Sequence, residues 1–299
     1  MKKRVLVIYN PRSGSDISRK GTKHFCDSFP RDRFDLKIII TKGKSDAKAI
    51  AFENKSNFDL IVSAGGDGTF NEVINGTMPD LKPIAYYPNG TTNDTAKTLG
   101  ISSRIEDTVS LIESGKIENL DVGKMNGTYF FCTVSFGFGS NASLKTNQSL
   151  KNVLGHFAYI VSGIKNAGDI RPVKMKITLD NETLNGEFVF GAVVNTISVG
   201  GIFNISENNF KLNDGEFEVV LVPKINSMIE IPKLLALLRQ QKFDNHHIIV
   251  KKCRNILFEA DRKIPWLVDG ENSGCNSHVS IDVIKKGIRV YTPQNNSYL

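Results

Sequence analysis

The sequence lacks any apolar run long enough to cross a bilayer as a helix, which needs about 20 residues. Its best candidates are Phe188–Val194, which a glycine interrupts, and the short run Leu234–Leu238. Near the start of the chain, the apolar run Val5–Tyr9 is too short for the core of a signal peptide. These absences predict a cytoplasmic protein with no transmembrane segment, whose membrane contact is peripheral.

Several familiar site motifs are also missing. The four cysteines (Cys26, Cys132, Cys253 and Cys275) form neither a disulfide framework nor a C-x-x-C zinc motif, so we expect them to be small hydrophobic residues of the core. The sequence has no Walker motif G-x-x-x-x-G-K-[ST], and no G-x-G-x-x-G follows the first predicted strand. The sequence therefore argues against two common classes of nucleotide-binding protein.

The composition is that of a globular protein with a modest positive charge. Of 299 residues, 40% are hydrophobic and 23% are charged, which is enough apolar material for one or two packed cores. The 38 Lys and Arg against 31 Asp and Glu give a net charge of +7, which favours anionic partners such as nucleotides or acidic lipid headgroups. The sequence shows no aromatic and basic stripe, so we expect no nucleic-acid partner.

The first part of the chain alternates between strand and helix patterns. Apolar runs occur at Arg4–Tyr9, Leu36–Thr41, Leu60–Ser63 and Ile84–Tyr87, and helical patterns occur near 16–28, 45–56, 68–77, 93–99 and 103–114. This alternation predicts a parallel sheet covered by helices on both faces, an α/β domain over residues 1–121. Ligands of such a sheet bind at the carboxyl ends of its strands.

After about residue 121 the pattern changes to strands separated by turns. These runs are Thr128–Ser135, Val173–Leu179, Glu187–Asn195, Phe217–Pro223, His247–Lys251, Ile256–Ala260, Val279–Ile284 and Ile288–Tyr291. They predict a β-rich antiparallel sandwich or barrel over residues 122–289, with residues 290–299 packed back on the first domain. Two helices interrupt it, at Ala142–Ala167 and Ser227–Gln241. The second is amphipathic, and it either faces the core or lies on a membrane surface.

The densest motif is Ser63–Glu72, which lies between a predicted strand and a predicted helix. Gly65, Gly66 and Gly68 remove Cβ atoms where the backbone has to turn tightly and approach a ligand closely. The N–H groups at the start of the following helix make an anion site suited to phosphate. Asp67 would repel phosphate unless Mg²⁺ lies between them, so the motif favours a nucleotide with Mg²⁺. The alternative is a glycine-rich turn in which Asp67 caps the helix.

Two further turns occupy equivalent positions in the strand and helix series. Asn10–Ser15 follows the first strand, and Pro88–Asp94 follows the fourth. Each alone is only a turn followed by a capped helix. Because loops at the carboxyl ends of parallel strands meet at one edge of the sheet, together they suggest a cradle for a triphosphate.

These motifs, taken in order, resemble the diacylglycerol kinase catalytic superfamily, and in particular the soluble bacterial lipid kinases. The matching segments are Asn10-Pro11-x-Ser13-Gly14, Gly65–Thr77, Gly90-Thr91-x-Asn93-Asp94 with Ala96, Asp121–Gly123, Asp214-Gly215 and Asp269–Glu271. The resemblance covers nearly the whole chain. It implies a three-layer α/β domain, similar to those of phosphofructokinases and NAD kinases, that binds ATP, and a sandwich domain that binds the lipid substrate.

The resemblance also assigns roles to individual residues. The expected ATP contacts are Asn10, Ser13, Thr41, Gly65, Gly66, Asp67, Gly68, Thr69, Phe70, Asn71 and Thr91. Asp67 is expected to bind the Mg²⁺ of ATP or help to order it, in a catalytic network with Asp94 and Asp121. Three carboxylates close together would repel one another unless a cation or hydrogen-bond donors compensate them.

Two acidic residues in the second half complete the expected site. Glu271 resembles the family's general base, and the apolar residues that precede it predict that it is buried; the alternative is an ordinary turn carboxylate. Asp214 resembles the ligand of a second Mg²⁺, together with the backbone carbonyls of Lys211 and Glu216. Its alternative is an Asn-Asp-Gly turn between strands.

The sequence departs from the family pattern at two places and leaves other functions open. Thr95 replaces an aromatic residue, and the polar segment Ser206–Phe210 replaces a Pro-x-Ala element.

We predict an ATP-dependent kinase that phosphorylates diacylglycerol or a related lipid at the inner face of the membrane, and that could form a homodimer. The alternatives are an NAD kinase, or a catalytically weak nucleotide- or lipid-binding regulator with the same fold.

Overall fold

The computed structural model describes residues 2–13, 23, 25, 27–137, 171–199, 203–204, 210–227, 229–240, 243–296 and 298–299. Its contacts divide the chain into unit 1, Met1–Val122 with Lys286–Leu299, and unit 2, Gly123–Lys285. Most of the helix predicted near 16–28, the whole of Ala142–Ala167, and residues 206–209 lie outside the described residues.

Unit 1 is built on a parallel sheet. Its strands are β1 (Lys3–Tyr9), β2 (Phe34–Ile40), β3 (Leu60–Gly65) and β4 (Pro83–Pro88), in the order β2-β1-β3-β4. The last part of β15 (Glu271–Thr292) adds a further parallel strand beside β4, where Arg289 and Val290 pair with Pro83 and Ile84. β1, β3 and β4 are almost continuously buried because helices cover both faces of the sheet, whereas β2, at the edge, is only partly buried.

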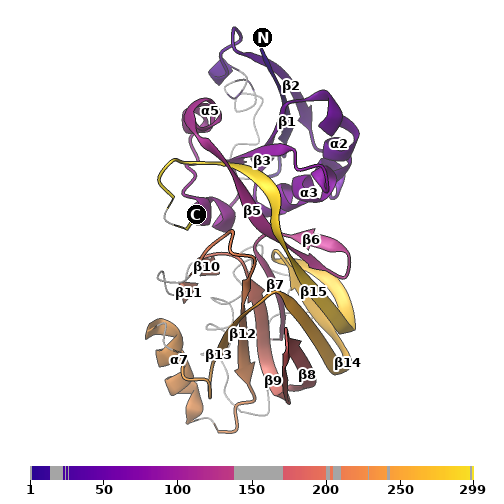
Figure 1. Ribbon diagram of the computed structural model, residues 1–299, viewed down its shortest axis with the longest axis vertical. Helices are drawn as coiled ribbons and strands as arrows, with labels where there is room; N and C mark the ends of the chain where they lie inside the picture. The colour runs from indigo at the N-terminus through magenta and orange to yellow at the C-terminus, as the bar shows by residue number, and fades with distance from the viewer. Residues whose placement is uncertain are drawn as a thin grey trace. The chain divides into compact units, whose positions relative to one another are not determined.

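The helices of unit 1 are α2 (Asp46–Asn54), the short 3-10 helix η1 (Lys55–Asn57), α3 (Asp67–Thr77), α4 (Asp94–Leu99) and α5 (Ile105–Ser114). α2 and α3 lie on one side of the sheet and α5 on the other (Figure 1). Alternate residues of each strand point to opposite faces, and Val5 and Val7 pack in one core with Val109 and Ile112 of α5. The predicted α/β fold class is confirmed.

Unit 2 is mostly antiparallel strands. They are β6 (Thr128–Phe130), β7 (Thr133–Gly137), β8 (Val173–Leu179), β9 (Glu182–Val194), β12 (Phe217–Pro223), β13 (Ile249–Cys253), β14 (Asn255–Val268) and the first part of β15. The strand β5 (Lys116–Met125) ends in this unit. Two short strands, β10 (Ser198–Val199) and β11 (Phe203–Asn204), pair with each other. β9 and β14 are long, and each pairs with β8 along one half and with β7 along the other. The sandwich thus encloses one core, in which Trp266 and Phe136 are fully buried.

The predicted helix Ser227–Gln241 corresponds to α7 (Glu230–Gln240). Ile231 and Leu234 pack against Val220 and Val222 of β12, as the core-facing interpretation requires. Ile229, just before the helix, is 86% exposed. Among the described helices, none is both long and apolar enough to span a bilayer.

The cysteines agree only in part with their predicted burial. Cys132 and Cys253 are buried, and burial raises the pKa of the Cys253 thiol to about 12. Cys275 was expected in the core but is exposed, because it lies near the turn between β14 and β15, beyond the packed part of the strand. Cys26 lies outside the described residues.

Candidate active site

Three loops meet at the carboxyl edge of the sheet in unit 1. Asn10, after β1, donates its backbone N–H to the carbonyl of Ala64 on β3 (2.8 Å). Asn89, after β4, donates its backbone N–H to the carbonyl of Gly65 (2.8 Å). The loop after β3 is therefore held between the other two, as the order of parallel strands predicts.

Gly66 and Gly90 bring two of these loops into direct backbone contact. A Cβ atom on Gly90 would lie 2.5 Å from the Cα of Gly66, which is closer than real Cβ atoms approach. A Cβ on Gly66 would lie 3.3 Å from the Cα of Gly90. Glycine is needed at position 90 because the neighbouring atom is rigid backbone, whereas a Cβ at position 66 would be only tightly packed.

Replacing Gly90 by Ala is therefore expected to push the two loops apart and to destabilise unit 1 by about 1–3 kcal/mol. The matched control is Gly43→Ala, because a Cβ there meets nothing within 4 Å. Chemical denaturation of both variants measures the effect. Equal stability of the two would show that the loop contact is not restrictive.

Polar side chains of the loops also bind one another. Asn10 donates a side-chain N–H to the hydroxyl of Thr69 (2.9 Å), and the Ser13 hydroxyl accepts the backbone N–H of Gly66 (3.3 Å). Thr41, at the end of β2, is buried and donates its backbone N–H to the carbonyl of Tyr9 (2.9 Å). These three predicted ATP contacts thus line one edge of unit 1.

The other predicted ATP contacts differ in their surroundings. Phe70 is buried and its ring lies 4.8 Å from that of Tyr86, so its side chain belongs to the core. Asn71 accepts hydrogen bonds from the side chain of Asn75 through its carbonyl and its side-chain oxygen. Thr91 is exposed in the loop after β4, where it is open to a ligand.

Asp67 joins two helix starts. It is the first residue of α3, whose N-cap is Gly66, so the alternative in which Asp67 caps its own helix is wrong. Instead its carboxylate accepts the backbone N–H groups of Asp94 (3.1 Å) and Thr95 (3.0 Å), at the start of α4. The carboxylate is oriented by these two donors and stabilises the positive end of α4.

Asp94 and Asp121 do not share a metal-holding cluster with Asp67. The Asp94 carboxylate pairs with Lys97 (3.3 Å), and its backbone N–H donates to Asp67 (3.1 Å). Asp121 is fully buried on β5 and accepts the backbone N–H of Lys286 (2.7 Å). Within the described part of the chain, no three His, Cys, Asp or Glu side chains gather where they could hold a metal.

Glu72 was not singled out from the sequence, but it supports the site. Its carboxylate accepts the backbone N–H groups of Ser45 (2.7 Å) and Ala47 (3.1 Å), so it caps α2 from α3. α2 has no cap from its own side chains. Glu72 thereby joins α3, which follows the glycine-rich loop, to the neighbouring helix α2. Because the partners lie far apart in the sequence, no local sequence pattern indicates this contact.

In unit 2, Asp269 organises the turn that carries Glu271. Asp269 has a left-handed backbone (φ 46°), and its carboxylate accepts the backbone N–H groups of Phe131 (3.1 Å), Cys132 (2.9 Å) and Thr133 (2.8 Å). These donors explain why the predicted strand Thr128–Ser135 is broken into β6 and β7, since Phe131 and Cys132 bond Asp269 instead of a strand.

Asp269→Ala is expected to lower the stability of the protein by about 2–4 kcal/mol, because it leaves backbone N–H groups without an acceptor. The matched control is Asp261→Ala, whose carboxylate makes an exposed ion pair with Arg262 (3.3 Å). Thermal or urea unfolding of both variants measures the difference. A stability equal to that of the control would remove Asp269 from its structural role.

Glu271 is exposed, so the prediction that it is buried is wrong. The apolar side chains that suggested burial, such as Trp266 and Val268, point into the sandwich, whereas Glu271 follows the turn at the start of β15. Glu271 pairs with Val268 in the strand register. An exposed carboxylate at a turn held by Asp269 is accessible to a ligand.

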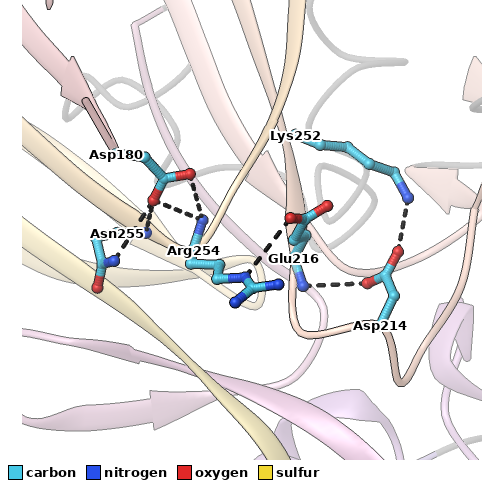
Figure 2. Close-up of polar contacts among 6 residues, drawn as sticks. All are labelled: Asp180, Asp214, Glu216, Lys252, Arg254 and Asn255. Carbon is cyan, nitrogen blue, oxygen red and sulfur yellow. Dashed lines mark hydrogen bonds and ion pairs between the residues drawn. The ribbon is translucent and has the colours of Figure 1, made fainter. Parts of the chain in front are cut away.

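Asp214 lies in the loop before β12 and already has two partners. Its carboxylate accepts the backbone N–H of Glu216 (3.1 Å) and pairs with the Lys252 ammonium (2.7 Å; Figure 2). Lys252 also lies 3.5 Å from the buried carboxylate of Glu218. Burial raises the pKa of Glu218 to about 7, although Lys252 opposes the shift. The exposed Lys211 stands at the start of the same loop.

The parallel α/β sheet with its glycine-rich loop edge, followed along the chain by an antiparallel sandwich, is an architecture suited to binding a nucleotide. Residues 4–125 match the family described as the diacylglycerol kinase catalytic domain. Residues 132–292 match the YegS C-terminal NAD kinase beta sandwich-like domain. The chain belongs to the diacylglycerol kinase family.

Individual relatives agree with this family. The chain is 33% identical to a diacylglycerol kinase of Bacillus subtilis over 276 residues, 91% of each protein. It is 30% identical to a diacylglycerol kinase of Staphylococcus saprophyticus over 299 residues, 99% of this chain and 97% of the relative. A crystal structure of a candidate diacylglycerol kinase from Bacillus anthracis superimposes with a TM-score of 0.80, at 28% identity and 98% coverage of both chains.

The comparisons confirm the resemblance, the α/β-plus-sandwich fold class and the expectation of a lipid kinase. They favour that class over the alternative NAD kinase, since the relatives named above are diacylglycerol kinases. The roles expected of individual residues, among them Asp67, Asp121 and Glu271, stay predictions.

Proposed function

We propose that this protein transfers the γ-phosphate of ATP to the free hydroxyl of diacylglycerol or a related lipid, forming phosphatidic acid or an analogue. The observation that carries the proposal is the loop edge of unit 1, where the start of α3 and the loops after β1 and β4 meet. The first N–H groups of a helix have no partner within the helix, and they bind phosphate oxygens well. Family membership supports the lipid acceptor.

ATP binding is assigned to the loop edge. The side chains of Asn10, Ser13 and Thr69 already bond within this edge, so little ordering is required when ATP binds. Thr41 and Thr91 add donors after β2 and β4, the strands on either side of the β1–β3 pair. The glycines at 65, 66 and 68 allow the backbone to approach the phosphates.

Asp67 is assigned the central acidic role. Its two backbone donors orient the carboxylate while leaving further lone pairs for a ligand, so the residue fits an Mg²⁺ that accompanies ATP. When bound, Mg²⁺ would neutralise charge on the phosphate oxygens during transfer. Asp94 and Asp121 would then act by positioning, Asp94 through its N–H and Asp121 through the backbone of Lys286.

Glu271 is proposed as the general base. An alcohol becomes a good nucleophile only as its proton is accepted, and Glu271 is the acidic residue of the family's Asp-Gly-Glu motif. The bond from the lipid oxygen to phosphorus forms while the γ-phosphorus–oxygen bond to ADP breaks, and the lipid proton passes to the Glu271 carboxylate. Asp269 positions the turn that carries this base.

The lipid acceptor requires access to a membrane surface. We propose that the protein associates peripherally with the cytoplasmic face, because its net charge of +7 favours an anionic leaflet at about 1 kcal/mol per well-placed Lys or Arg. A homodimer is a further expectation, which the size of the purified protein in solution tests.

The proposal is tested with purified protein, radiolabelled ATP, MgCl₂ and mixed micelles of diacylglycerol, monoacylglycerol, sphingosine or phosphatidylglycerol, with NAD as a separate acceptor. Label in diacylglycerol or another lipid establishes the kinase and names its acceptor. Label in NAD alone would replace the proposal by an NAD kinase. ATP binding without label in any acceptor would favour the alternative function, a catalytically weak regulator with the same fold.

A further inference from the structure

The ammonium of Lys252 pairs with the carboxylate of Asp214, which the family resemblance assigns to a second Mg²⁺. The Nζ of Lys252 lies 2.7 Å from Oδ2 of Asp214 and 3.5 Å from Oε1 of Glu218 (Figure 2). The other oxygen of Asp214, Oδ1, accepts the backbone N–H of Glu216 (3.1 Å). Both oxygens of Asp214 therefore have partners from the chain itself.

The strand register puts the lysine there. β12 and β13 are antiparallel, and Lys252 stands directly opposite Glu218. Cross-strand neighbours lie about 5 Å apart at Cβ, so a long side chain on Lys252 reaches the loop before β12 without distortion. The position of the ammonium follows from the sheet and does not depend on a mobile surface side chain.

A second basic residue holds the next carboxylate of the loop. Arg254 Nε lies 3.6 Å from Oε1 of Glu216, and the Asp180 carboxylate accepts the backbone N–H groups of Arg254 and Asn255 (Figure 2). The stem of Lys285 also packs over Gly215, since a Cβ there would lie 2.9 Å from its Cδ. Basic side chains thus surround the loop.

This arrangement does not fit a divalent cation on Asp214. An Mg²⁺ bound to the same oxygen would lie within a few ångströms of the ammonium, and like charges at that distance repel strongly near a partly buried site. The Glu218 side chain is only 4% exposed and the Lys252 side chain 30%, so water screens the repulsion poorly. Removing the ammonium would leave the nearly buried Glu218 carboxylate uncompensated.

We propose that the Lys252 ammonium is the resident cation of the Asp214 loop. In this chain it takes the place of the second Mg²⁺, which the family resemblance assigns to Asp214. The inference concerns the stability of unit 2 and is independent of the proposed kinase activity. It predicts that the wild-type protein gains no stability from Mg²⁺ at Asp214, since a ligand stabilises a fold only by binding to it. It also predicts that removing the ammonium opens the loop to Mg²⁺.

The test compares the wild type with Lys252→Met, which keeps an apolar stem and removes the charge. The matched control is Lys251→Met, the neighbouring lysine of β13, whose ammonium pairs with Glu182 (3.1 Å), the two side chains being 40% and 53% exposed. Thermal unfolding is measured without nucleotide, in EDTA and in millimolar MgCl₂ at constant ionic strength. Each protein is also made with Asp214→Asn, which separates this loop from any Mg²⁺ bound near Asp67.

The expected result is a Tm of Lys252→Met about 5 °C or more below that of the wild type in EDTA. MgCl₂ should raise the Tm of this variant, and Asp214→Asn should abolish the rise. The wild type and Lys251→Met should show no rise that depends on Asp214.

Two results would overturn the proposal. One is a rise in the wild-type Tm with MgCl₂ that Asp214→Asn removes, which would show that the metal binds beside Lys252. This comparison needs only the wild type and Asp214→Asn, so it can be made even if Lys252→Met fails to fold. The other is a folded Lys252→Met that does not respond to MgCl₂. Because neither measurement uses turnover, failure of the kinase assay would leave this result unchanged.

Discussion

Glu271→Gln is expected to lower the kcat for lipid phosphorylation about 100- to 10,000-fold, while ATP binding stays near the wild-type value. The amide keeps the size and exposure of the side chain but cannot accept the proton of the lipid hydroxyl. Because Asp269 holds the turn through backbone N–H groups, the substitution should not disturb the local fold. The measurement is a steady-state assay with radiolabelled ATP, together with a direct titration of nucleotide binding.

The matched control for Glu271→Gln is Asp282→Asn, which removes an exposed carboxylate from the same strand, β15. Its kcat should equal that of the wild type. If Glu271→Gln retains full turnover with the same control, the residue is not the base, and another group must accept the proton. A parallel loss of ATP binding would instead place Glu271 in nucleotide binding.

Asp67→Asn is expected to lower kcat about 100- to 1,000-fold, the usual effect of removing one charged group that stabilises a transition state. Asn can still accept a backbone N–H at the start of α4, so the helix keeps part of its cap. The expected loss of stability is therefore small, about 1 kcal/mol. Activity and thermal unfolding are measured on the same preparation.

The control for Asp67→Asn is Glu53→Gln, an exposed acidic residue on α2. Both variants lose one negative charge from unit 1, but only Asp67 lies on the loop edge. Equal activity of the two would contradict the catalytic role of Asp67. A large loss of stability with unchanged kcat would show that its carboxylate serves only to hold α4.

The strands and helices of unit 1 could be predicted because their signals are local. Buried β-strands such as β1 and β3 are short apolar runs, and α3 begins directly after the glycines of its loop. The meeting of three loops at one edge was also predictable, because parallel strands present their carboxyl ends together. The motifs of the family then assigned candidate roles to the residues of those loops.

Unit 2 was less predictable because its strands are long and change partners. Ile256–Ala260 was predicted as a short strand, but it is one part of the long strand β14 (Asn255–Val268), which pairs with β8 and then with β7. β5, most of which belongs to unit 1, was also missed, because its first half is largely exposed and polar. Glu271 was expected to be buried because the residues before it are apolar. Successive residues of a strand point to opposite faces, however, and beside a turn both faces are exposed.

By itself, the sequence determined the α/β-plus-sandwich fold, the loop motifs and the kinase family, because these depend on local patterns and on the order of motifs along the chain. The tertiary structure alone decided what each charge meets. It joins Asp67 to the start of α4, Glu72 to the start of α2, and Lys252 to Asp214. These partners lie far apart in the sequence, so no local pattern specifies them. Strand register and helix packing bring them within hydrogen-bond distance.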